Sequence, residues 1–278
     1  MNIERMLSDH VDKRKVTNAN VEYHDRIAGT YDIDNATKHI FGKYTQARIK
    51  EIISLLHKRT AGQVLLDVGC GTGNVLKYAE QHYNLSIGID VSEEMLKICH
   101  EKNFMTLKAD CYQIPLASNS VDVVSSFSVL HHLYNPSDFL AEVGRVLKKG
   151  GYLYTDWDVN AHYVAKKKSS WLFSGLLLAR EILSPKSKNL DKYKKLSNLA
   201  EYHLFSTRMG LDPEKIKTEL NRLGFEHIDI IYNSNCKSIF NTGKISLANR
   251  IGYWLKMFFL RSHDAKVLSP LFLIMARK

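Results

Sequence analysis

Hydrophobic positions along the chain follow two spacings that predict strands and helices in turn. Short continuous apolar runs predict buried strands, whereas apolar residues three or four positions apart predict helices. The predicted strands cover residues 64–68, 86–90, 106–109, 121–127, 151–156, 227–232 and 271–277. The predicted helices cover residues 35–58, 74–82, 93–102, 136–149, 212–223 and 245–261. Alternation at this spacing predicts a mostly parallel, doubly wound α/β sheet, in which ligands bind beyond the carboxyl ends of the strands.

The alternation stops between residues 160 and 205, where strongly apolar and strongly basic stretches follow one another. Nine of the thirteen residues in 171–183 are apolar. Residues 166–195 contain nine Lys or Arg residues against two acidic ones. We therefore expect a mostly helical insertion here rather than a continuation of the sheet.

Composition narrows the location and the class of partner. The net charge of +10 and the pI of about 9.3 favour anionic partners such as nucleic acid or an anionic membrane surface. The four cysteines form no CxxC pair, so we expect neither a structural metal site nor a disulfide framework. The N-terminus lacks the apolar core of a signal peptide, and no apolar run has the roughly 18 residues of a spanning helix. A cytoplasmic protein fits these features best.

The first predicted strand leads into a glycine-rich loop, and residues 64–74 read VLLDVGCGTGN. A dinucleotide-binding loop has the pattern G-x-G-x-x-G. Gly69 and Gly71 fit this pattern, but Asn74 occupies the third glycine position and the third glycine is Gly73. No Gly-Lys-Ser/Thr follows, which excludes a P-loop. The loop therefore resembles a phosphate site only in part.

Two aspartates end the next two predicted strands. Asp90 can accept hydrogen bonds from both hydroxyls of a ribose, and Asp110 can accept one from an adenine amino group. The alternative for each is an ordinary solvated aspartate at a strand end or in a loop. The histidine pair in SSFSVLHHL (125–133) follows the fourth predicted strand.

Five segments together resemble the class I S-adenosylmethionine-dependent methyltransferases, in particular the small-molecule group with the E/D-x-G-C-G-T-G loop. The matching segments, in order, are LDVGCGTGN (66–74), IGIDVS (87–92), KADCYQIPL (108–116), VDVVSSFSVLHHL (121–133) and RVLKKGGYLYT (145–155). The resemblance implies a Rossmann-like sheet of seven strands with an antiparallel C-terminal strand. It also implies S-adenosylmethionine as methyl donor, S-adenosylhomocysteine as product, and no metal.

The resemblance further implies which residues hold the cofactor. Asp67 would help to position the ammonium group, Val91 and Met95 would flank the adenosine, and Phe127 would lie near the sulfonium. An N-terminal aromatic residue, here Tyr31, would close over the cofactor. The implied site consists of Tyr31, Asp67, Gly69, Cys70, Gly71, Gly73, Asp90, Val91, Met95, Asp110, Cys111 and Phe127.

These considerations divide the chain into four parts. Residues 1–60 form an N-terminal helical arm or lid, and residues 61–159 form the cofactor-binding core. Residues 160–205 form a helical cap over the acceptor pocket, and residues 206–278 complete the methyltransferase core.

The acceptor and the catalytic base stay open at this stage. His131 and His132 are the first candidates for a base, although the matching family segment often carries His whatever the acceptor. Further candidates are His24, Asp156, His162 and His203. The apolar and basic segments 166–195 and 244–261 favour a small hydrophobic acceptor, such as a lipid, a quinone or a natural-product-like molecule, and contact with an anionic membrane. The alternatives are an RNA methyltransferase, which basic charge permits, and a non-catalytic cofactor-binding accessory or regulatory protein.

Overall fold

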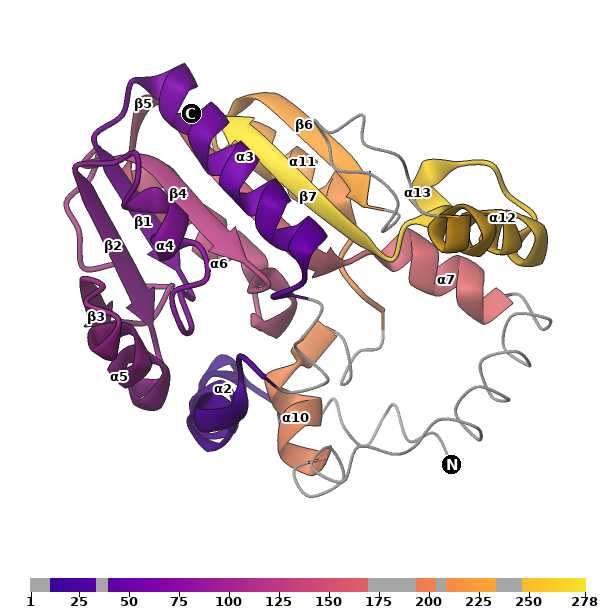
Figure 1. Cartoon of the computed structure of the whole chain (residues 1–278), viewed down its shortest axis with the longest axis horizontal. Helices are drawn as coiled ribbons and strands as arrows, with labels where there is room; N and C mark the ends of the chain where they lie inside the picture. The colour runs from indigo at the N-terminus through magenta and orange to yellow at the C-terminus, as the bar shows by residue number, and fades with distance from the viewer. Residues whose placement is uncertain (1–10, 34–39, 170–193, 204–208, 234–246) are drawn as a thin grey trace.

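A computed structural model describes residues 11–33, 40–169, 194–203, 209–233 and 247–278 (Figure 1). One seven-stranded sheet runs through this part of the chain in the order β3-β2-β1-β4-β5-β7-β6. Its strands are β1 (Val64–Val68), β2 (Leu85–Asp90), β3 (Thr106–Lys108), β4 (Val121–Phe127), β5 (Leu147–Val159), β6 (Glu226–Asn233) and β7 (Leu271–Arg277). Strands β1 to β5 pair in parallel, and β7 is antiparallel to both β5 and β6. The predicted fold class is therefore confirmed.

Helices cover both faces of the sheet and one of its ends. They are α2 (Lys13–Ile27), α3 (Lys43–Thr60), α4 (Leu76–Ala79), α5 (Glu93–Glu101), α6 (Pro136–Val146), α7 (Ala161–Ser169), α10 (Lys194–Ala200), α11 (Pro213–Arg222), α12 (Leu247–Leu260) and α13 (Ala265–Leu268), with 3-10 turns η1 (Ala28–Thr30) and η2 (Leu130–His132). Ser92 caps α5 as predicted, because its side chain accepts a hydrogen bond from the Met95 N–H. No helix in the described ranges is long and apolar enough to cross a bilayer.

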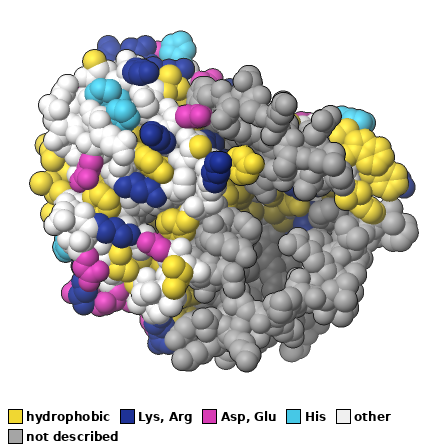
Figure 2. All heavy atoms as spheres, viewed as in Figure 1, with side chains coloured by type: hydrophobic (Ala, Val, Ile, Leu, Met, Phe, Trp, Pro, Cys, Tyr) yellow, Lys and Arg dark blue, Asp and Glu magenta, His cyan; other side chains and the backbone are white. Residues whose placement is uncertain are grey.

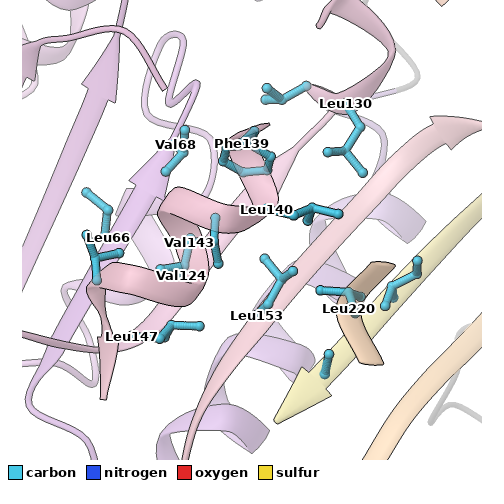
Figure 3. Packing of buried hydrophobic residues seen from close by; sticks show 14 of the residues in the cluster. Leu66, Val68, Val124, Leu130, Phe139, Leu140, Val143, Leu147, Leu153 and Leu220 are labelled. Atoms are coloured by element: carbon cyan, nitrogen blue, oxygen red, sulfur yellow. The ribbon is translucent and has the colours of Figure 1, made fainter. Parts of the chain in front are cut away.

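Alternate residues of each central strand enter two separate cores. On one face, Leu66, Val124 and Leu153 pack against α6 and α11, and Figure 3 shows them beside Phe139, Val143 and Leu220. On the other face, Leu65, Val123 and Tyr154 pack against α3. This alternation follows from the two-residue period of a strand that is covered on both sides.

Several predicted helix boundaries are wrong. The helix predicted over residues 35–58 corresponds to α3, which begins only at Lys43. The sequence predicted a helix over residues 136–149 that ends at Gly150, but α6 ends at Val146 and β5 begins at Leu147. Leu147 has extended dihedral angles and pairs with Val121 of β4. Pairing in the sheet therefore overrides the helical pattern. The predicted helix over residues 74–82 is also shorter in the structure, where α4 covers only Leu76–Ala79.

The N-terminal helix α2 lies beyond the carboxyl ends of the parallel strands, next to α10 (Figure 1). Two aspartates attach this part of the chain to the core. Asp25 accepts a hydrogen bond from the Ser92 hydroxyl at 2.6 Å. Asp32 accepts one from the Thr72 hydroxyl at 2.6 Å and one from Lys102 Nζ at 3.0 Å. The apolar residues 171–183 of the predicted insertion lie outside the described residues, whereas α7 and α10 lie at the two ends of this insertion.

Candidate active site

A pocket opens where the loops after β1, β2, β3 and β4 meet helix α2. The strand order reverses between β1 and β4, and open α/β sheets bind ligands at such a reversal. Most of the predicted site residues line this pocket: Tyr31, Gly69, Gly71, Asp90, Val91, Met95, Asp110, Cys111, Phe127 and His132. The sequence analysis did not predict several other lining residues, namely Val16, Thr17, Asn20, Tyr112, Leu133 and Tyr134.

Asp90 ends β2 and holds two neighbouring loops together. Its Oδ2 accepts a hydrogen bond from the Gly71 N–H at 2.8 Å, and its Oδ1 accepts one from the Ser92 N–H at 2.9 Å. Each carboxylate oxygen has a second lone pair, so Asp90 can still accept hydrogen bonds from two hydroxyl groups of a molecule bound in the pocket. Asp110 uses Oδ1 in a similar way, since this atom accepts the Tyr112 N–H at 3.0 Å.

The three glycines after β1 have different surroundings. A Cβ on Gly69 would approach Val129 Cγ2 to 2.5 Å, and a Cβ on Gly73 would approach Phe104 Cε2 to 2.4 Å. A Cβ on Gly71, in contrast, would have no atom within 4 Å. Gly71 therefore presents open space to the pocket, where a bound molecule can approach the backbone. Gly69 and Gly73 provide room for neighbouring side chains.

The structure does not bring Asp67, Cys70 or Gly73 to the pocket lining. Cys70 packs in a small apolar cluster with Cys99 and Phe104. Asp67 is buried in β1, and its Oδ1 accepts a hydrogen bond from the Ser125 hydroxyl at 2.7 Å. Burial raises the pKa of Asp67 to about 7, and the charge of Asp90 contributes in the same direction.

The two candidate histidines differ in their contacts. His131 is buried outside the pocket lining, where its Nδ1 lies 2.9 Å from Asp158 Oδ1 and its Nε2 lies 3.5 Å from Glu201 Oε2. Burial lowers its pKa, but these two carboxylates outweigh burial and the net pKa is about 9. His132 lines the pocket, and its Nδ1 lies 3.0 Å from the Ala200 carbonyl oxygen. Burial and the adjacent His131 lower the pKa of His132 to about 3.

The remaining candidate bases lie in different environments. Asp156 is fully buried and forms a bidentate ion pair with Arg48, so it is a structural group on β5. His162 and His203 line a second hollow, away from the glycine loop, and His162 Nε2 lies 3.1 Å from Asp212 Oδ1. His24 lines the main pocket, with its ring 5.0 Å from that of His132. Glu201 and Asp158, which no sequence motif identified, hold His131.

The arrangement fits S-adenosylmethionine. Asp90 offers acceptor atoms for the ribose hydroxyls, and Gly71 offers the open backbone that the amino-acid part of the cofactor needs. Val91 and Met95 supply apolar surface beside Asp90, and Asp110 lies in the loop after β3. The pocket thus combines two carboxylates with apolar surface, which suits a molecule that carries hydroxyl groups, amino groups and a flat ring.

Comparison with known proteins agrees with this geometry. Residues 66–155 match the family model "Methyltransferase domain". An uncharacterised protein of Methanocaldococcus jannaschii is 30% identical over 211 residues, which cover 75% of this chain and 72% of that protein. The ubiquinone/menaquinone biosynthesis C-methyltransferase UbiE of Campylobacter jejuni is 28% identical over 75% of this chain and 90% of its own length. The tRNA (carboxymethyluridine(34)-5-O)-methyltransferase ALKBH8 of Mus musculus is 32% identical over 125 residues, but these are only 18% of that protein.

A solved structure agrees at the level of the fold. Phosphoethanolamine N-methyltransferase 2 of Haemonchus contortus, in complex with phosphomonomethylethanolamine and S-adenosylhomocysteine, aligns with a TM-score of 0.58. The alignment covers 97% of this chain and 60% of that one, with 18% sequence identity. The match to a methyltransferase domain and the methyltransferases among its relatives identify the protein as an S-adenosylmethionine-dependent methyltransferase. On its strand order, its pocket and these relatives, the chain belongs to the class I S-adenosylmethionine-dependent methyltransferases.

Proposed function

We propose that the protein transfers a methyl group from S-adenosylmethionine to a small hydrophobic acceptor. The observation that carries this proposal is the composition of the pocket beyond the cofactor residues. Val16 of α2, Val129 and Leu133 line it together with aromatic side chains, and few charged groups are present there. Predominantly apolar pockets with a few polar groups bind hydrophobic small molecules.

The cofactor supplies an activated methyl group, and the chain supplies position. Asp90 would hold the ribose hydroxyls, Asp110 the adenine edge, and the Gly71 backbone the amino-acid end. Because displacement at a methyl carbon requires alignment of acceptor and donor, holding both molecules accounts for much of the catalysis. Of the two histidine candidates, His132 lines the pocket and so can touch an acceptor. His131 lies outside the pocket lining and contacts Asp158.

A second part of the proposal concerns where the acceptor comes from. Helix α12 exposes Trp254 (65%), Leu255 (41%) and Phe258 (63%), and the rings of Trp254 and Phe258 are stacked. Figure 2 shows a group of hydrophobic side chains at the right edge, where Figure 1 places α12. Lys256 and Arg261 belong to the same segment. We infer peripheral contact with the anionic, cytoplasmic face of a membrane, which would deliver a lipid or quinone acceptor.

Liposome binding tests this contact. The double substitution Trp254→Ser and Phe258→Ser should reduce co-sedimentation with anionic liposomes at low salt by more than tenfold. Tyr44→Ser removes an exposed aromatic residue from α3 and serves as the matched control. Equal binding by the two variants would refute the assignment of α12, and no binding by the wild type would refute membrane contact altogether.

Methyl transfer from radiolabelled cofactor tests the acceptor class. We expect label in the lipid or quinone fraction of a cell extract. The similarity to a tRNA methyltransferase and the charge of +10 favour one second candidate, which is transfer to RNA. Label in tRNA or rRNA, with none in the organic extract, would replace the small-molecule proposal by the RNA one.

A further inference from the structure

Three side chains that could bind a metal ion meet beside the pocket. His131 and His132 belong to η2, and Glu201 follows α10. One ring nitrogen of each histidine and one carboxylate oxygen of Glu201 lie within 4.8 Å of one another. They form the one such cluster in the ranges that the structure describes.

The distance between His131 and Glu201 fits shared ligation better than direct hydrogen bonding. The Nε2 and Oε2 atoms are 3.5 Å apart. A good N–H···O hydrogen bond is shorter, at about 2.9 Å. Two ligands of a tetrahedral ion with bonds of about 2.0 Å are about 3.3 Å apart. Only a small contraction would therefore bring both atoms to an ion between them.

The other ring nitrogens of both histidines are already held. His131 Nδ1 lies 2.9 Å from Asp158 Oδ1, and His132 Nδ1 lies 3.0 Å from the Ala200 carbonyl oxygen. A carbonyl or carboxylate oxygen can only accept, so each Nδ1 carries a hydrogen, and a ring that gives up its second proton to bind a metal has its lone pair on Nε2. Histidines that bind metals are oriented in this way by a carboxylate or a backbone carbonyl.

Asp158 is itself fixed in this supporting position. It is fully buried, its Oδ1 also accepts the His131 backbone N–H at 3.1 Å, and its Oδ2 accepts the Thr155 hydroxyl at 2.9 Å. The buried charges point the same way. Two carboxylates lie beside His131, the buried one of Asp158 and the partly buried one of Glu201, and a divalent cation balances both negative charges.

We propose that His131, His132 and Glu201 bind a divalent first-row transition metal ion, with Zn²⁺ as the probe of choice. Two histidines and one carboxylate leave coordination positions open for a further oxygen ligand. Because His132 also lines the pocket, the ion lies beside the space for the acceptor. It would favour an acceptor with a hydroxyl or enol oxygen, whose deprotonation a bound cation promotes. This choice of acceptor rests on the proposed function, whereas metal binding does not.

The spacing of the cysteines and histidines predicted no structural metal site, and the family resemblance implied no metal. Adjacent histidines followed much later by a glutamate match no short metal motif. The site is formed only when α10 packs on α2 and places Glu201 next to η2 (Figure 1). A bound ion would therefore also attach α10 to the sheet.

Metal titration of the chelator-stripped full-length protein tests the site. We expect calorimetry with Zn²⁺ to give one ion per chain with submicromolar affinity, and Co²⁺ to give the visible absorption of a low-symmetry, four- or five-coordinate ion. Glu201→Gln should weaken Zn²⁺ binding at least 100-fold. Asp158→Asn should weaken it 10- to 100-fold, the usual effect of losing a residue that orients a ligand. Glu219→Gln on α11, whose carboxylate pairs with Arg222 and does not belong to the cluster, is the matched control.

Several results would overturn the proposal. They are the absence of a stoichiometric ion, unchanged affinity in Glu201→Gln, or equal losses in Glu201→Gln and Glu219→Gln. If circular dichroism shows that Glu201→Gln is unfolded, His132→Asn takes its place with the same expectation. Binding of S-adenosylhomocysteine to the same metal-free protein is measured in parallel. Binding of S-adenosylhomocysteine without Zn²⁺ binding refutes only the metal site, whereas failure to bind S-adenosylhomocysteine refutes the proposed function.

Discussion

Substituting alanine for two glycines of the loop after β1 should separate cofactor binding from packing. Gly71 and Gly73 both have positive φ angles, 53° and 87°, so alanine adds backbone strain of about 1 kcal/mol at either position. The added methyl groups have different surroundings. The one at Gly73 would lie 2.4 Å from Phe104 Cε2, whereas the one at Gly71 would have no protein atom within 4 Å.

The cost at Gly73 follows from the surroundings of Phe104. Its ring is buried with Leu96 and Cys99, so it cannot move away without displacing them. Overpacking of this kind costs about 1–3 kcal/mol. Gly73→Ala should therefore lower the free energy of unfolding by about 2–4 kcal/mol, and Gly71→Ala by about 1 kcal/mol. Gly71→Ala should instead lose cofactor affinity, because its methyl group enters the pocket.

Urea unfolding and calorimetry with S-adenosylhomocysteine measure the two effects. We expect Gly71→Ala to bind the cofactor product at least tenfold more weakly than Gly73→Ala, after correction for unfolded protein. Adding Phe104→Leu to Gly73→Ala should restore part of the lost stability, because the smaller side chain makes room. Wild-type affinity in Gly71→Ala, or equal stability of the two single variants, would show that the loop does not work in this way.

Three further predictions concern buried or pocket-lining charges. Arg48→Met leaves the fully buried Asp156 without its cation. It should therefore lower the free energy of unfolding, measured by urea titration, by about 3–5 kcal/mol, and a loss below about 1 kcal/mol would contradict this. Burial raises the pKa of Asp67 to about 7 in the folded state, whereas the unfolded state releases this proton near pH 4. The contribution of Asp67 to the free energy of unfolding therefore falls as pH rises from about 4 to about 7. The free energy of unfolding of Asp67→Asn, relative to that of the wild type, should therefore rise by at least about 1 kcal/mol between about pH 5 and about pH 8. A difference between the two proteins that stays constant with pH would refute the raised pKa. Asp90→Ala should weaken S-adenosylhomocysteine binding at least tenfold by calorimetry, and unchanged affinity would mean that the ribose lies elsewhere.

The sequence predicted the elements of the sheet because a strand covered on both faces and a helix covered on one have different hydrophobic periods. Strand β7 and helix α11 lie within one residue of their predicted bounds. The error at the end of α6 has a physical cause. Leu147 fits a helical pattern locally, but it pairs with Val121 on a strand that is distant in the sequence. No local pattern contains that contact.

The sequence by itself also predicted the methyl donor, through a family resemblance whose motifs lie mostly in loops directly after consecutive strands. Parallel strands bring their carboxyl ends together, so Gly71, Asp90 and Asp110 reach one pocket whatever the rest of the chain does. Tertiary structure alone decided that Gly73 and Cys70 serve packing, since their neighbours Phe104 and Cys99 come from another element. It alone also joined His131 to Asp158 and Glu201, because those contacts depend on how β5 and α10 pack and not on spacing along the chain.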